Sequence, residues 1–388
     1  MPLLVRKKQI TYYLGAGASH NAIPVVENLL TRISSLTKYL EKKTIPYNNI
    51  NVQKKNYRDL KKLTTLQVII HEFNWLLEEC SFHQTIDTLA KKYFIQGKKE
   101  WLVRLKRALF VYFYLEQNIN FPTIKLNPEI KNQELEIPEY QDFVDKRYDD
   151  LIANLADREN DEIKLKDHVK ILTWNYDMQI ELALKVYLEG ETYGLNKIKS
   201  SYQIHPNHHT NQLEKGESLD LDRFATIKLN GNAFIENQIS KKSIINKSIY
   251  DLRPSNARLL EDDILKYFLD FYYNFLKGPQ GLYKDYYSLF NFAFEGNKVF
   301  DGQKHLLSEA SKIMKATDVL IIIGYSFPFF NSSVDKNLLL RCNAKEIIIQ
   351  DYKADEIKSR LTLLAPNFAQ SKISKVPPGK YFPIYSET

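Results

Sequence analysis

Cysteine is nearly absent from this sequence of 388 residues, which has only Cys80 and Cys342 and no C-x-x-C pair. Two cysteines so far apart provide neither a disulfide framework nor the ligands of a structural zinc site. Long hydrophobic runs are missing too, since no stretch approaches the roughly 18 apolar residues of a membrane-spanning helix. The apolar run near the N-terminus is too short for a secretory signal. These absences predict a cytoplasmic protein with no membrane contact.

Charge and apolar content are ordinary for a folded protein. Charged residues make up 26% of the chain and hydrophobic residues 44%, while aromatic residues are frequent at 13%. The 54 basic and 47 acidic residues give a formal net charge of +7. The basic doublets are scattered along the sequence, whereas a nucleic-acid footprint needs clustering on one face. Direct nucleic-acid binding is therefore not expected.

A strand predicted over residues 10–14 is followed by a turn of small residues, namely Gly15, Ala16, Gly17, Ala18 and Ser19. Glycines allow a tight turn and a close approach of the backbone to a phosphate. A helix predicted from Pro24 to about Leu40 would offer its N–H groups to that phosphate. His20 takes the place of the third glycine of the G-x-G-x-x-G fingerprint. The stretch is typical of a dinucleotide-binding turn, with an ordinary strand–helix turn as the alternative.

Further buried strands are predicted over residues 169–173, 225–229, 318–323 and 346–349, with helical spacing between them. Continuous apolar strands that alternate with helices indicate an α/β fold, a Rossmann-like doubly wound parallel sheet. We expect one domain over residues 1–388 with large helical insertions, at 41–165 and at 232–300. Ligands bind at the carboxyl ends of such strands. The candidate residues there are Asn175, Asp177, Asn230, Gly324, Tyr325, Ser326, Gln350 and Asp351.

Four short motifs together resemble those of the sirtuin family, and they occur in the family's order. They are Gly15–Ser19 with Ala22-Ile23-Pro24, Thr173-Trp174-Asn175-Tyr176-Asp177, Lys228-Leu229-Asn230-Gly231, and Gly324-Tyr325-Ser326. The likeness is greatest to the sirtuin-like NAD hydrolases (NADases) of bacterial antiphage defence. Protein-deacylating sirtuins usually carry four zinc cysteines, and this sequence lacks them. The resemblance therefore implies a hydrolase that cleaves NAD to ADP-ribose and nicotinamide.

The resemblance also implies roles for individual residues. The turn at residues 15–19 would hold the pyrophosphate, Asn175 and Asp177 the nicotinamide ribose, and residues 324–326 the second phosphate. Gln350 and Asp351 are expected at the adenosine end. No metal is expected, because the neighbours of His205, His208 and His209 are typical of an exposed loop.

One position departs from the family pattern. Asn230 stands where Lys-Leu-His-Gly has the histidine that acts as a base, and an amide cannot take a proton near pH 7. Three explanations stay open: the chain binds NAD without cleaving it, it uses another base such as one of the three histidines above, or the substitution is engineered. Under the first explanation, the chain is a catalytically silent NAD- or ADP-ribose-binding subunit that regulates or scaffolds a partner.

The resemblance further implies that activity is switched by a protein partner or by formation of a homo-oligomer. A NAD hydrolase that is always active would harm its own cell. The sequence itself shows no separate sensor segment.

Overall fold

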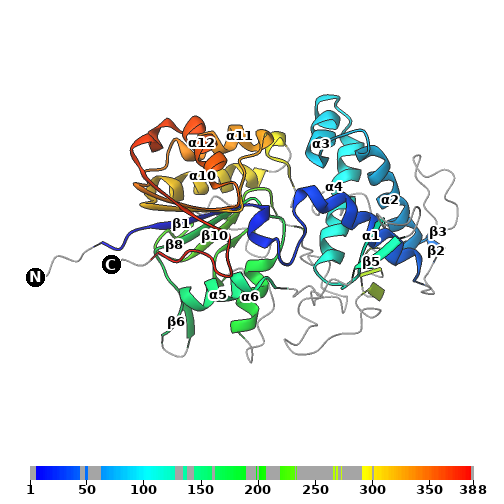
Figure 1. Cartoon of the computed structure of the whole chain (residues 1–388), viewed down its shortest axis with the longest axis horizontal. Helices are drawn as coiled ribbons and strands as arrows, with labels where there is room; N and C mark the ends of the chain where they lie inside the picture. Colours follow the sequence, from blue (N-terminus) through cyan, green and yellow to red (C-terminus); the bar gives the residue numbers. More distant parts are fainter. Residues whose placement is uncertain are drawn as a thin grey trace, which may run out of the picture.

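The computed structural model describes residues 6–43, 49–50, 63–126, 134–137, 144–159, 162–188, 198, 201–206, 219–231, 233, 265–266, 268–269, 272, 291–298 and 301–385. In this part of the chain a seven-stranded parallel sheet has the order β13-β12-β11-β1-β8-β10-β9 (Figure 1). Its strands are β1 (Ile10–Leu14), β8 (Val169–Thr173), β9 (Ile204–His205), β10 (Ala225–Lys228), β11 (Val319–Ile323), β12 (Glu346–Gln350) and β13 (Lys372–Val376). The prediction of an α/β Rossmann-like parallel sheet is confirmed.

The central strands are buried on both faces. Every residue of β1, β8, β10 and β11 is buried. Strands in this environment need apolar side chains at every position, which explains the unbroken run Val319-Leu320-Ile321-Ile322-Ile323. From β1 the chain moves to β8 on one side and later returns to β11 on the other side. The strand order therefore reverses at β1 and β11.

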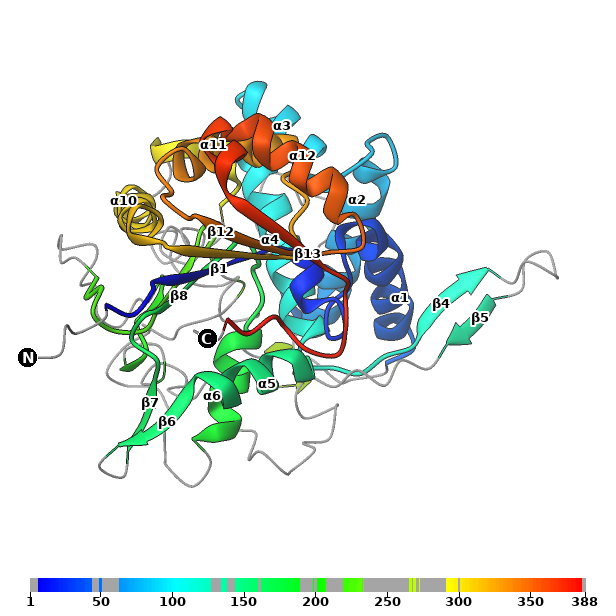
Figure 2. The ribbon, with the colours of Figure 1, turned by 60° about the vertical axis from the view of Figure 1, so that its left-hand side comes forward.

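Helices cover both faces of the sheet (Figures 1 and 2). One face packs against α10 (Asp301–Ala316), α11 (Ser332–Leu339) and α12 (Ala354–Leu364). The other packs against α5 (Lys146–Leu155) and α6 (Gln179–Tyr187). The C-terminal segment 377–385 also crosses this second face, where the Tyr12 hydroxyl donates to Pro383 O at 2.9 Å.

A helical layer lies beside the sheet and comes from the chain between β1 and β8 (Figure 1). It contains α1 (Leu29–Glu41), α2 (Thr65–Cys80), α3 (Ile86–Ile95) and α4 (Lys99–Glu116). Two short antiparallel pairs accompany these helices: β2 (Asn49–Ile50) with β3 (Leu63–Thr64), and β4 (Thr123–Leu126) with β5 (Glu134–Ile137). A third pair, β6 (Ala156–Glu159) with β7 (Glu162–Leu165), follows α5 and lies away from this layer (Figures 1 and 2).

Local sequence signals and one buried ion pair organise this layer. Thr64 and Gln67 form a capping box at the start of α2. The Arg32 guanidinium of α1 lies 2.8 Å from Glu116 Oε1 of α4, and both side chains are buried. The second predicted insertion, 232–300, lies mostly outside the described residues.

The structure differs from the sequence-based predictions in three places. Helix α1 begins at Leu29 and not at Pro24, because two short 3-10 turns, η1 (Ala16–Ser19) and η2 (Val26–Asn28), come first. Strand β13 was not predicted, since none of its residues is buried: three are exposed and two are half-buried, as in an edge strand. His205 was placed in an exposed loop, which is wrong: it is buried in β9. His208 and His209 lie outside the described residues.

Among the helices that the structure describes, none is both long and apolar enough to span a bilayer.

Candidate nucleotide site at the carboxyl edge of the sheet

The segments that follow neighbouring strands are tied to one another by backbone hydrogen bonds. Trp174 N, just after β8, donates to Leu14 O at the end of β1 at 3.0 Å. Leu229 N, just after β10, donates to Thr173 O at 2.8 Å. Gly15 N donates to Ile323 O at 3.1 Å, and Gly324 N to Gln350 O at 3.1 Å. The motifs predicted to share this edge therefore do share it.

The glycines of the first turn are explained by a close contact between two backbones. A Cβ atom on Gly17 would lie 2.7 Å from Gly324 Cα, and one on Gly324 would lie 2.3 Å from Gly17 C. Gly324 also has a φ of +58°, which glycine adopts at little cost. The N–H groups of Gly15, Gly17 and Ala18 donate to Ile323, Gly324 and Gly15 carbonyls. These three amides are thus used inside the protein, and the phosphate role of the turn stays a prediction.

Ser19 is the centre of a buried hydrogen-bond network. Its Oγ accepts from Asn175 Nδ2 at 3.1 Å and lies 3.1 Å from the Tyr148 hydroxyl. It also hydrogen-bonds the Asp177 carboxylate. Since a carboxylate only accepts, the single Ser19 proton goes to Asp177 and Tyr148 donates to Ser19. We call Ser19, Tyr148, Asn175 and Asp177 the Ser19 network.

The network fixes one half of the Asn175 amide and leaves the other half available. Asn175 Nδ2 is held by Ser19, and its backbone N donates to Thr173 Oγ1 at 3.0 Å. Within the described part of the chain, Asn175 Oδ1 has no hydrogen-bond partner. Asn175 is therefore oriented to accept a hydrogen bond from a ligand.

Asp177 is held by partners on three elements. Its Oδ1 accepts from Gln179 N at 3.1 Å, and its backbone O accepts from the buried Lys228 ammonium. The same ammonium lies 2.6 Å from Glu181 Oε1, and both of these side chains are buried. Burial raises the pKa of Asp177 above its ordinary value, and the Lys228 charge and the Ser19 hydrogen bond oppose that shift.

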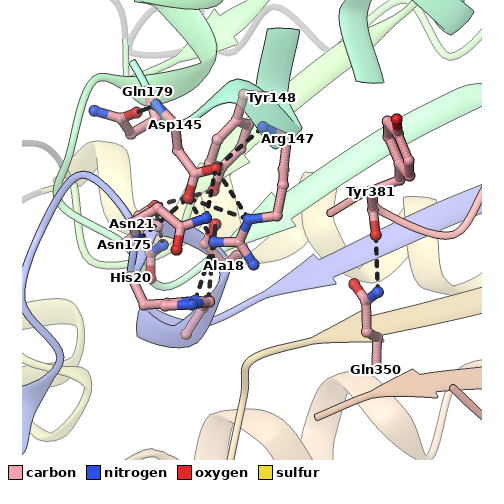
Figure 3. Close-up of polar contacts among 12 residues, drawn as sticks. Ala18, His20, Asn21, Asp145, Arg147, Tyr148, Asn175, Gln179, Gln350 and Tyr381 are labelled. Atoms are coloured by element: carbon pink, nitrogen blue, oxygen red, sulfur yellow. Dashed lines mark hydrogen bonds and ion pairs between the residues drawn. The ribbon is translucent and has the colours of Figure 1, made fainter. Parts of the chain in front are cut away.

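Helix α5 and the residue before it supply site residues that the sequence motifs did not predict (Figure 3). Arg147 Nη2 donates to Ala18 O at 2.9 Å and lies 3.1 Å from His20 Nδ1. Arg147 also pairs with Asp145, and this guanidinium lowers the pKa of Asp145 although burial alone would raise it. Arg147, a cation in contact with the glycine turn, is thus paired within the protein. Residues 140–156 predict an amphipathic helix, but nothing in their spacing points to the glycine turn.

Asn230 lies beside Tyr176 at the same edge. Its Nδ2 donates to the Tyr176 hydroxyl at 3.2 Å. Asn230 is 6% exposed, and its Oδ1 is buried without a hydrogen-bond partner in the described residues. A buried polar atom in this state costs free energy unless a ligand or water satisfies it. Asn291 N, from the segment before η4 (Ala293–Lys298), donates to Asn230 O at 2.9 Å and holds the loop.

Tyr325 belongs to a buried hydrogen-bond network around Asp335. Its hydroxyl donates to Asp335 Oδ2 at 2.8 Å, and its ring stacks on Trp174 with centroids 6.1 Å apart. Tyr13 and Trp174 also donate to Asp335 Oδ1, at 2.6 and 3.2 Å. We call Tyr13, Trp174, Tyr325 and Asp335 the Asp335 network.

Among the hydrogen bonds of the described residues, none joins the remaining predicted residues to the Ser19 network. Gln350 Nε2 donates to Tyr381 O of the C-terminal segment at 2.9 Å (Figure 3). Asp351 accepts from Lys353 N at 2.8 Å. Ser326 is exposed, and Pro24 is half-buried in the chain between η1 and η2. In the described residues no group of three or more His, Cys, Asp or Glu side chains could hold a metal ion.

No family model matches this chain, and no curated protein matches it.

Proposed function

We propose that the chain binds NAD at the carboxyl edge and hydrolyses it to ADP-ribose and nicotinamide. One observation carries the proposal: the Ser19 network fixes the Asn175 amide and leaves its Oδ1 available at the edge where α/β sheets bind ligands. The resemblance to sirtuin-like proteins implies that this asparagine contacts the nicotinamide ribose. An Oδ1 held in this way can accept from a ribose hydroxyl or orient a water molecule.

The chemistry of the reaction fits the polarity of the residues present. Nicotinamide leaves through an oxocarbenium-like state, in which positive charge develops on the ribose. Groups that are already oriented and carry negative or partial negative charge stabilise such a state. Asn175 Oδ1 and the Asp177 carboxylate have this polarity, and the Lys228 and Ser19 contacts hold Asp177 in place.

A second candidate function rests on Asn230. Because an amide cannot accept a proton near pH 7, a site that depended on this position for its base would bind NAD or ADP-ribose without cleaving it. The chain would then regulate or scaffold a partner. The resemblance supports an effector of antiphage defence in the cytoplasm, switched by a protein partner or by self-association.

Two measurements on the full chain test the proposal. Calorimetric titration with ADP-ribose measures binding, and chromatography of nicotinamide released from NAD measures turnover. We expect Asn175→Ala to weaken ADP-ribose binding at least tenfold, equal to about 1.4 kcal/mol. The exposed Asn154→Ala of α5 is the matched control and should bind as wild type does.

The outcomes separate the two candidates. Binding with nicotinamide release supports the hydrolase, and binding without release supports the silent subunit. Absence of ADP-ribose and NAD binding would contradict both.

A further inference from the structure

The C-terminal segment is held against the sheet by hydrogen bonds to two of its backbone carbonyls. Tyr381 O accepts from Gln350 Nε2 at 2.9 Å (Figure 3), and Pro383 O accepts from the Tyr12 hydroxyl at 2.9 Å. Gln350 ends β12 and Tyr12 lies in the middle of β1, so two strands of the sheet fix the segment. Phe382 is the residue between these two anchors.

The ring of Phe382 packs on two residues of α5. Phe382 is 3% exposed, and its ring meets the Tyr148 ring edge-on, with centroids 5.1 Å apart and planes at 88°. Arg147 Cζ lies 5.0 Å from the centre of the same ring, which is a cation–π distance. Both residues belong to the candidate site, because Tyr148 contacts Ser19 and Arg147 donates to the glycine turn. The C-terminal segment therefore contacts the candidate site through one buried side chain.

A continuous series of contacts runs from Phe382 to the Asn175 amide. Tyr148 is 1% exposed, and in a close-packed interior a ring moves only if its neighbours move. The Tyr148 hydroxyl donates to Ser19 Oγ, which accepts from Asn175 Nδ2 as well. A shift of the Tyr148 ring would therefore disturb the hydrogen bonds that fix Asn175.

We infer that Phe382 is a positioning residue for the Ser19 network and that it acts through the Tyr148 hydroxyl. This inference rests on the proposed binding of NAD, and it applies to the hydrolase and to the silent subunit alike. A group that is already oriented binds its ligand more tightly, because less conformational freedom is lost on binding. Phe382 thus raises affinity by keeping the Asn175 amide in one orientation.

The test is a double-mutant cycle on the full chain, with ADP-ribose affinity measured by calorimetry and folding checked by urea unfolding. Phe382→Ala should weaken ADP-ribose binding about fivefold, in the range of couplings between contacting residues. Phe382→Leu keeps an apolar side chain at this position and should weaken binding about threefold. It provides the measurement if the alanine variant does not fold.

The second arm of the cycle removes only the hydroxyl of Tyr148. Tyr148→Phe keeps the ring that packs on Phe382, and it should itself weaken binding about fivefold. In this background either change at Phe382 should alter affinity by less than about 1.5-fold, because the hydroxyl to be positioned is gone. A purely structural role of Phe382 would lower the unfolding midpoint and leave the affinity of the folded protein unchanged. Ile384→Ala, at an exposed position of the same segment, is the matched control and should bind as wild type does.

Each other outcome has a distinct meaning. A folded Phe382 variant that binds ADP-ribose as tightly as wild type overturns the inference and leaves the NAD site standing, and so does wild-type affinity of Tyr148→Phe. A loss that persists in full in the Tyr148→Phe background overturns the route through Tyr148 and assigns the effect to Arg147. No binding of ADP-ribose or NAD by wild type overturns the proposed function, and the role of Phe382 with it.

Discussion

Removing the Asp335 carboxylate should destabilise the protein more than most single substitutions do. Asp335 lies on α11 and is buried, and it accepts from Tyr13 of β1, Trp174 after β8 and Tyr325 after β11. The Asp335 network therefore ties together the ends of three strands that carry the candidate site.

The size of the effect follows from the donors that lose their acceptor. A buried donor without a partner costs roughly 1–3 kcal/mol. In Asp335→Ala the Tyr13 and Tyr325 hydroxyls lose this acceptor, whereas Trp174 Nε1 keeps the Tyr13 hydroxyl as an acceptor at 3.0 Å. Because the tyrosine hydroxyls can rotate, we expect a loss of about 2–4 kcal/mol at pH 5, below the upper sum of two separate penalties. Domains of this kind have about 5–15 kcal/mol of total stability, so the variant should still fold.

Asp335→Asn should behave differently, and its effect should depend on pH. Burial raises the pKa of Asp335 to about 7, although its three hydrogen bonds oppose the shift. The folded protein therefore binds a proton more tightly than the unfolded chain, and this contribution to stability is lost as pH rises from about 4 to about 7. Asparagine resembles the neutral acid and does not ionise. The stability of wild type relative to Asp335→Asn should thus fall over this pH range.

Urea unfolding followed by tryptophan fluorescence measures these free energies, with the exposed Asp355→Ala as a control that should leave the midpoint unchanged. A loss below about 1 kcal/mol for Asp335→Ala would refute the acceptor argument. A difference between wild type and Asp335→Asn that stays constant from pH 4 to 8 would refute the raised pKa.

Two further substitutions test the packing at the same edge. Gly17→Ala should lower the unfolding midpoint, because its Cβ would lie 2.7 Å from the Gly324 backbone. The control Gly379→Ala meets no atom closer than 4.0 Å and should leave the midpoint unchanged. Equal midpoints of the two variants would mean that the turns at Gly17 and Gly324 do not pack closely. Lys228→Met should cost about 3–5 kcal/mol, because it leaves the buried Glu181 carboxylate uncompensated. The double variant with Glu181→Leu should recover much of that loss, and failure to recover would assign the cost to the lost Asp177 contact instead.

The central strands could be predicted because burial on both faces demands continuous apolar runs. The run at residues 319–323 became β11, and the predictions for β1, β8, β10 and β12 were equally close. The edge strands escaped prediction for the same physical reason. Lys372–Val376 is an edge strand with charged, exposed positions, and β9 has only two residues.

Only the candidate-site residues that directly follow predicted strands could be located from the sequence. Asn175 and Ser19 follow adjacent parallel strands, and their side chains do meet. Arg147 and Tyr148 reach the glycine turn from α5, about 130 residues further along the chain. No local pattern encodes that contact. The glycines also show the limit of motif reading, since a close approach to a phosphate and a close approach to another backbone require the same residue.

The polarity of the edge bears on which part of NAD the proposed site would recognise best. The N–H groups of Gly15, Gly17 and Ala18 are used by carbonyls, and the Arg147 charge is paired with Asp145. An anion needs donors, and these donors already have partners. Among the candidate-site side chains that the structure describes, the atoms without a hydrogen-bond partner include two acceptors, Asn175 Oδ1 and Asn230 Oδ1. Acceptors suit ribose hydroxyls and the positive charge that develops as nicotinamide leaves. The side chains therefore support recognition of the nicotinamide ribose more strongly than the glycine turn supports recognition of the pyrophosphate.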